Sequence, residues 1–163
     1  IQFEQPLTEL SVTSQFTMAI TPPAPPTTAM TIADVREMAA ASRDLSILSP
    51  APYLFASRIA GLDPAIADLA APLLPPDRSI VEAANALTHA VHEKIAYQSG
   101  SSTSRTPPGE AFAAGRGVCQ DQSHVMIAAL RAHSIPAAYI SGYLNTRPPP
   151  GQEKLVGACR GSM

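Results

Sequence analysis

The first regular pattern in the chain is an alternation of apolar and polar residues at 10–20. Leu10, Val12 and Phe16 fall on one side of an extended chain, and polar residues fall on the other. A period of two predicts a half-buried strand. Four of the five residues at 22–26 are prolines, which cannot donate a backbone hydrogen bond to a sheet and favour an extended linker. The pattern therefore predicts a β segment that ends in a linker.

Three helices are predicted in the next part of the chain, over 32–42, 63–69 and 80–96. Each helix has a starting signal, and in the third helix apolar residues also recur at helical spacing. Thr31 precedes Asp34 by three residues, Asp63 precedes a proline, and Ser79 and Glu82 have the spacing of a capping box. The Ser, Thr, Gly and Pro residues that dominate 99–109 indicate a polar loop.

The last third of the chain predicts a helix followed by a strand. A short turn of helix at 110–114 is expected to close at Gly115. A longer helix should start after Gly117 and end near His133, since its apolar residues cover one broad face. Residues 137–144, AAYISGYL, favour a strand, which the prolines at 148–150 close.

Length and charge exclude several classes of protein. The 163 residues suit one domain, and a net charge of −2 gives no general attraction to nucleic acid or acidic membranes. No apolar run reaches the roughly 18 residues of a membrane span. Two cysteines are too few for a disulfide scaffold, so we expect free thiols and a cytoplasmic location.

Cys119 is the first candidate for chemistry, because it follows a Gly-Arg-Gly turn and opens a predicted helix. A helix N-terminus carries partial positive charge and unpaired N–H groups, which favour a thiolate and can bind an oxyanion. Gly115 and Gly117 allow a sharp turn and leave room for a substrate carbonyl. Position alone also fits a buried cysteine that only packs, which is the commoner case.

The residues around Cys119 form recognisable sequence motifs. The chain has GVCQDQSH at 117–124, AALR at 128–131, IPA at 135–137 and SGYL at 141–144. This text resembles the bacterial transglutaminase-like family, whose members show G-V-C-x-D-x-x-H followed by G-I-P-A-R-Y-V-S-G-Y. The spacing agrees throughout. Ser134 and Ala138 stand where the family usually has glycine and arginine.

The resemblance implies an α+β fold, an incomplete papain-like core with helices packed on an antiparallel sheet. Residues 1–30 would be the remnant of a β-rich N-terminal region with its proline-rich linker. Residues 31–163 would be a truncated transglutaminase-like core.

The resemblance also implies a Cys-His-Asp triad, in which Cys119 is the catalytic nucleophile. In the family, the catalytic His lies in a His-Ala-Trp motif and the catalytic Asp in an Asp-Pro motif. Neither motif occurs after Cys119 in this sequence, and no His or Asp follows Tyr143. We therefore expect a truncation or frame shift before the catalytic His and Asp, and little or no activity in this chain.

Nearby residues offer weak alternatives for the base. Five residues of helix turn His124 about 140° away from Cys119, so a structural role is expected. His133 should lie at the end of the same helix. His89 and His92 are spaced as half a metal site, but no second pair accompanies them. Asp121 is explained by the helix dipole alone, although it could order the turn at the thiol.

The expected function is cysteine acyl transfer or hydrolysis on a protein or peptide substrate, without a cofactor, since neither a calcium cluster nor a phosphate loop is present. Neither nucleic acid nor membrane is expected as a partner. The alternative is a non-catalytic domain that binds peptides or partners; a redox role for the thiol is a third hypothesis. An open edge at strand 137–144 predicts association of chains.

Overall fold

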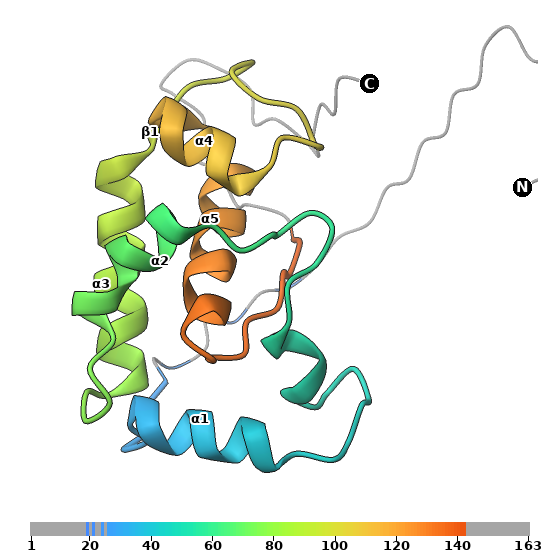
Figure 1. Cartoon of the computed structure of the whole chain (residues 1–163), viewed down its shortest axis with the longest axis vertical. Coiled ribbons are helices and arrows are strands. Elements are labelled where there is room, and N and C mark those ends of the chain that lie inside the picture. Colours follow the sequence, from blue (N-terminus) through green and yellow to red (C-terminus); the bar gives the residue numbers. More distant parts are fainter. Residues whose placement is uncertain (1–18, 20, 22–23, 25, 143–163) are drawn as a thin grey trace, which may run out of the picture.

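The computed structural model describes residues 26–142 and the single residues 19, 21 and 24 (Figure 1). This part of the chain is mostly helical. Its elements in chain order are α1 (Ile32–Ala41), η1 (Ala51–Leu54), α2 (Pro64–Ala70), η2 (Ala71–Leu73), α3 (Ile80–Lys94), β1 (Ala96–Tyr97), α4 (Pro108–Ala114), β2 (Arg116–Gly117) and α5 (Cys119–Ala132).

Two of the predicted helix starts are confirmed in atomic detail. Thr31 and Asp34 form a capping box, in which the Asp34 N–H donates to Thr31 Oγ1 at 3.2 Å and the Thr31 N–H donates to Asp34 Oδ2 at 2.8 Å. Asp63 Oδ1 accepts from the N–H groups of Ala65 and Ile66 at the start of α2. Local sequence therefore fixes these two starts.

The prediction for α3 was correct at its first residue, Ile80, but wrong about its cap and its last residue. Ser79 makes no side-chain cap; its backbone instead forms an antiparallel bridge with Thr31, which joins the starts of α1 and α3. The helix ends at Lys94, two residues early, because Ile95 is extended and Ala96–Tyr97 leaves the helix to form β1. Tertiary pairing thus replaces the Ser79 side-chain cap and ends the helix early, while the predicted first residue is confirmed.

The predicted antiparallel sheet is absent from the described residues. The sheet that they form is parallel and has two short strands, in which Ala96 pairs with Arg116 and Tyr97 pairs with Gly117. Residues 137–142 form no strand, and the rest of the predicted strand 137–144 lies outside the described part. The apolar run at 137–142 has no neighbouring strand there, so its β propensity alone does not form a ladder.

Helix α5 is the centre of the fold. It contacts α2, α3 and α4, while α1 lies across one end of the molecule (Figure 1). Val125, Ala128 and Ala129 of α5 are fully buried, and they pack in one apolar cluster with Leu87 of α3 and Ile66 of α2. The core therefore holds α5 along most of its length, and its N-terminal residue lies where α4 and the small sheet end.

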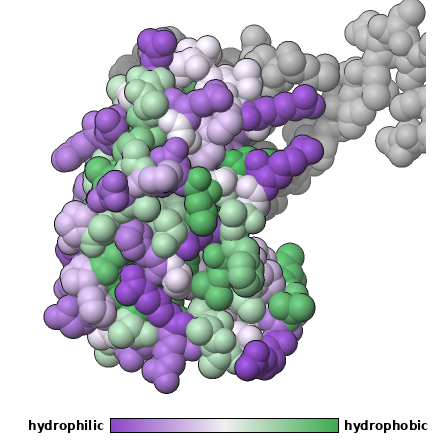
Figure 2. Space-filling view, viewed as in Figure 1, coloured by the Kyte–Doolittle hydropathy of each residue, from purple (hydrophilic) through white to green (hydrophobic). Residues whose placement is uncertain are grey.

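The connection between α1 and α2 carries many exposed apolar side chains. Leu45, Ile47 and Leu48 are mostly exposed, and so is Phe55 after η1. Apolar surface gathers toward the lower right of Figure 2, on the side where this connection runs. Single exposed apolar residues are common, but several in one short segment form a larger surface.

Several sequence predictions fall outside the described residues. These are most of the strand at 10–20 and most of the proline run at 22–26; Cys159, the second of the two cysteines expected to be free, also lies there. The division at residue 30 and the association of chains also stay predictions. Within the described helices, none is long and apolar enough to cross a membrane.

Candidate functional site around Cys119

Cys119 is the first residue of α5, and its side chain is exposed. The chain reaches it through a tight path: α4 ends at Gly115, which adopts a left-handed conformation with φ of 64°, and β2 follows at once. Backbone bonds hold this path in place, since the N–H of Ala96 donates to Gly115 O at 3.0 Å and that of Gln98 donates to Gly117 O at 2.8 Å. The glycine signal at 115 was therefore interpreted correctly.

A buried carboxylate holds the turn that precedes Cys119. Asp121 is 1% exposed, and its Oδ2 accepts from the Val118 N–H at 2.7 Å and from the Ser102 hydroxyl at 2.5 Å. A Cβ added at Gly117 would lie 2.8 Å from the Cβ of Asp121. The helix dipole alone, which the sequence suggested for Asp121, is thus an incomplete explanation, because the carboxylate also binds the backbone and a distant loop.

Two further side chains of α5 fasten its first turn. Gln122 Nε2 donates to Ile95 O at 2.9 Å, which links α5 to the end of α3. Ser123 Oγ donates to Cys119 O at 2.8 Å within the helix. The N–H groups of Cys119 and Gln120 donate to no backbone acceptor in the part of the chain that the structure describes. An exposed thiol therefore lies beside unpaired backbone donors.

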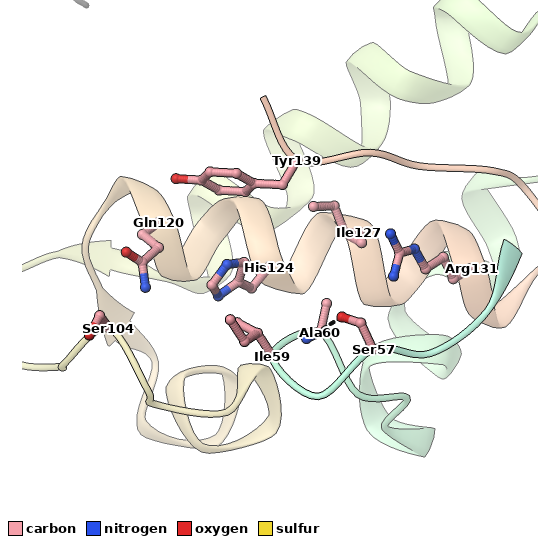
Figure 3. Close-up of a pocket in the computed structure, with 9 residues that line it drawn as sticks. All are labelled: Ser57, Ile59, Ala60, Ser104, Gln120, His124, Ile127, Arg131 and Tyr139. Carbon is pink, nitrogen blue, oxygen red and sulfur yellow. Dashed lines mark hydrogen bonds between the residues drawn. The ribbon is translucent and has the colours of Figure 1, made fainter. Parts of the chain in front are cut away.

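A cavity of about 380 Å³ runs along another face of α5 (Figure 3). Gln120, His124, Ile127 and Arg131 line it from the helix, at the spacing of one helical face. Tyr139 belongs to the segment that follows α5, and its ring lies over the helix. The other lining residues are Ser57, Ile59, Ala60 and Ser104. Cys119 is not among the lining residues, so the thiol and the cavity lie on different sides of α5.

His124 is held inside the fold, as a structural role requires. Its side chain is 7% exposed, and its ring lies 5.4 Å from that of Tyr139. Burial lowers the pKa of His124, and the nearby Asp121 carboxylate opposes this shift in part. His124 Nδ1 and Asp121 Oδ1 are both buried without a hydrogen-bond partner among the described residues. They belong to residues three apart on one helix, which lie on neighbouring positions.

The other histidines lie away from the thiol. His133 follows the last residue of α5, where its Nε2 bonds to Ala67 O at 2.9 Å, so it connects α5 to α2. His89 and His92 lie on the exposed side of α3. Among the described residues, no group of three or more His, Cys, Asp or Glu side chains could hold a metal ion. The structure therefore brings Asp121, and none of these histidines, to the turn at Cys119.

Ser102 is the contact that sequence reasoning missed. Residues 99–109 were interpreted as a polar loop with nothing to bury, yet Ser102 is half-buried and bonds to Asp121. Four hydroxyl residues follow one another at 101–104, so composition could not single out one of them. The signal that could have found it is the buried acid at 121, which needs donors.

A comparison with known families matches the chain to the sequence model of the transglutaminase-like superfamily over residues 67–160, more than half of its length. The matched range includes α3, α4 and α5 with Cys119. No solved structure matches the chain.

The chain is also similar to mycobacterial proteins. An uncharacterized protein of Mycobacterium tuberculosis is 42% identical over 93 residues, which are 57% of this chain and 30% of that protein. One of Mycobacterium bovis gives the same values. One of Mycobacterium leprae is 30% identical over 153 residues, or 93% of this chain and 50% of that protein. The chain thus spans half or less of the length of these relatives.

Proposed function

The chain belongs to the transglutaminase-like superfamily, and we propose that Cys119 is its nucleophile for acyl transfer. The observation that carries the proposal is the exposed thiol at the first residue of α5, inside the matched region. The acyl donor is a glutamine amide or a peptide carbonyl. The coarser assignment, a transglutaminase-like domain, does not depend on this proposal.

The chemistry follows from the place of the thiol. The thiolate attacks the carbonyl carbon, and the negative charge moves to the carbonyl oxygen. The N–H groups of Cys119 and Gln120, which have no backbone acceptor among the described residues, are the proposed donors to that oxygen. Collapse of the intermediate expels ammonia from a glutamine amide or the amine of a peptide, which takes a proton from solvent water, and leaves a thioester on Cys119. An amine or water then attacks the thioester and releases the acyl group.

The base for this reaction is not assigned to any histidine of the chain. His124 is buried beside Tyr139, and His133 bonds to α2. The superfamily's triad implies a His and an Asp that belong to other sequence motifs, His-Ala-Trp and Asp-Pro, and the given sequence does not contain these motifs after Cys119. The activity of a longer protein, its substrate and its partners therefore stay within the proposal.

An activated ester tests the proposed nucleophile without needing a general acid, because p-nitrophenolate leaves without being protonated. The chain is incubated with p-nitrophenyl acetate at neutral pH, and acetylation of each cysteine is followed by peptide mass spectrometry. We expect Cys119 to be acetylated faster than Cys159. Cys119→Ser serves as the control for the adduct's position. Acetylation of the two cysteines at equal rates contradicts the proposal.

The second candidate function is binding of a peptide without turnover. Two observations favour it: the cavity along α5, with apolar and polar lining, and the exposed apolar side chains between α1 and α2. A fluorescent glutamine peptide distinguishes the two candidates. Binding that Cys119→Ala leaves unchanged, with no acyl adduct in the unsubstituted chain, favours binding alone.

A further inference from the structure

We propose that Ser102 and Asp121 are positioning residues, which together hold the turn at Gly117–Cys119 so that the thiol stays at the end of α5. The inference rests on the proposed function, because it concerns the same cysteine. Ser102 belongs to the loop between β1 and α4, nineteen residues before Asp121. A loop distant in sequence therefore reaches the site through one hydroxyl group.

The carboxylate of Asp121 connects the loop to the turn. Its Oδ2 accepts from the N–H of Val118, the residue just before Cys119, at 2.7 Å, and from Ser102 Oγ at 2.5 Å. Hydrogen bonds to a charged acceptor are stronger than those between neutral groups. Since Asp121 is buried, water does not replace a lost donor, and an unpaired carboxylate oxygen is costly.

Close packing between Gly117 and Asp121 also restricts the position of the carboxylate. A Cβ at position 117 would lie 2.8 Å from both the Cβ and Oδ2 of Asp121, so the carboxylate fills the space beside Gly117. The backbone at Gly117 is also bonded, through its carbonyl oxygen, to the N–H of Gln98. Gly117, Val118 and the Asp121 side chain thus form one packed unit, and Ser102 closes its outer side.

The consequence for the thiol is geometric. The turn that Asp121 holds leads directly into Cys119, and the Ser102 hydroxyl is one of the two donors that keep the carboxylate in place. Removing that hydroxyl loosens the turn, so the thiol no longer stays at the start of α5. The reactivity of Cys119 therefore falls, although no group that contacts a substrate is removed.

The test compares iodoacetamide alkylation rates of Cys119 across pH in Ser102→Thr and Ser102→Val. These two side chains have the same shape, and only threonine keeps the hydroxyl. We expect Ser102→Thr to follow the unsubstituted chain. In Ser102→Val the rate near pH 7 falls about three- to tenfold, the effect of one lost hydrogen bond.

A matched control comes from the same loop. Ser101 donates to Gln98 O at 2.7 Å and does not reach α5, so Ser101→Ala loosens the loop without touching Asp121. Its profile should equal that of the unsubstituted chain. Circular dichroism first establishes that each variant keeps its helical spectrum.

The outcomes separate the positioning role from the proposed function. Equal profiles for Ser102→Thr and Ser102→Val overturn the positioning role. A rise in rate at every pH in Ser102→Val also overturns it, since that result indicates local unfolding. If Cys119 of the unsubstituted chain reacts no faster than Cys159, the proposed function fails instead.

Discussion

The hydroxyl of Ser102 donates a 2.5 Å hydrogen bond to the buried carboxylate of Asp121, which also accepts from the backbone just before Cys119. This contact links a loop to the first turn of the central helix. It explains why an acidic residue is buried two positions after the exposed cysteine, where a surface carboxylate would have satisfied the helix dipole equally well.

Replacing Asp121 should destabilise the fold. Asp121→Ala leaves the Val118 N–H and the Ser102 hydroxyl without their acceptor in a buried site, which costs about 1–3 kcal/mol. Urea unfolding followed by circular dichroism measures the loss. Asp68→Ala on the exposed side of α2 is the control, with an expected change within about 0.5 kcal/mol. Equal effects of the two substitutions would contradict the role of the buried carboxylate.

A methyl group at position 117 should also be costly. Gly117→Ala places its Cβ 2.8 Å from the Asp121 side chain, so the helix start or the carboxylate must shift. Overpacking of this kind costs about 1–3 kcal/mol. The matched variant is Gly61→Ala, where nothing lies within 4 Å of the added atom. Thermal melts should show a lower Tm for the first only; an unchanged Tm for Gly117→Ala is the contrary result.

His124 should make stability depend on pH in the acid range. Its native pKa lies below the roughly 6.5 of an exposed imidazole, because burial outweighs the attraction of Asp121. As pH falls through that value, the unfolded chain binds a proton that the native chain resists. The free energy of unfolding therefore decreases below about pH 6.5, by at most about 1.4 kcal/mol per pH unit for one group.

Denaturant unfolding at several pH values between 5 and 8 tests the contribution of His124. His124→Gln should show a shallower loss on acidification than the unsubstituted chain. His89→Gln, on the exposed side of α3, should keep the full slope. Parallel curves for His124→Gln and the unsubstituted chain would count against a buried neutral imidazole. Arg131 and Asp121 are the charged groups to hold constant in the comparison, since both lie near His124.

The core around α5 predicts a larger effect than any of these polar changes. Leu87 of α3 is fully buried in the cluster that includes Val125 and Ala128 of α5. Leu87→Ala should cost about 2–5 kcal/mol, from lost burial and the cavity left behind. Leu48→Ala, at a side chain that is 93% exposed, is the control. A loss below 1 kcal/mol for Leu87→Ala would be inconsistent with this core.

Local signals in the sequence predicted the helices well. Thr31 and Asp63 marked the starts of α1 and α2, Gly115 marked the end of α4, and α5 begins and ends within a residue of its expected limits. These features depend on neighbouring residues, so they can be recognised from the sequence alone. Cys119 was likewise predicted to open a helix, and α5 begins at this residue; its role as a nucleophile stays a prediction.

Non-local features were beyond the sequence. The early end of α3 depends on pairing of Ala96–Tyr97 with a segment twenty residues later, and Ser79 pairs with Thr31, which is far from it in the sequence. The expectation of an antiparallel sheet came from the family resemblance, and the described residues form only the parallel pair of β1 and β2. The Ser102–Asp121 bond, which spans a loop and a helix, belongs to the same class of feature.

The alkylation rate of Cys119 at pH 7, in the native chain and in the chain unfolded with guanidinium chloride, tests the central claim most directly. Peptide mass spectrometry reads both cysteines, and the unfolded chain gives the rate of the same thiol without its helix. The account predicts that native Cys119 reacts several-fold faster than unfolded Cys119, because the fold presents the exposed thiol at the first residue of α5, beside backbone N–H groups. A native rate equal to or below the unfolded rate would contradict the assignment of Cys119 as a nucleophile.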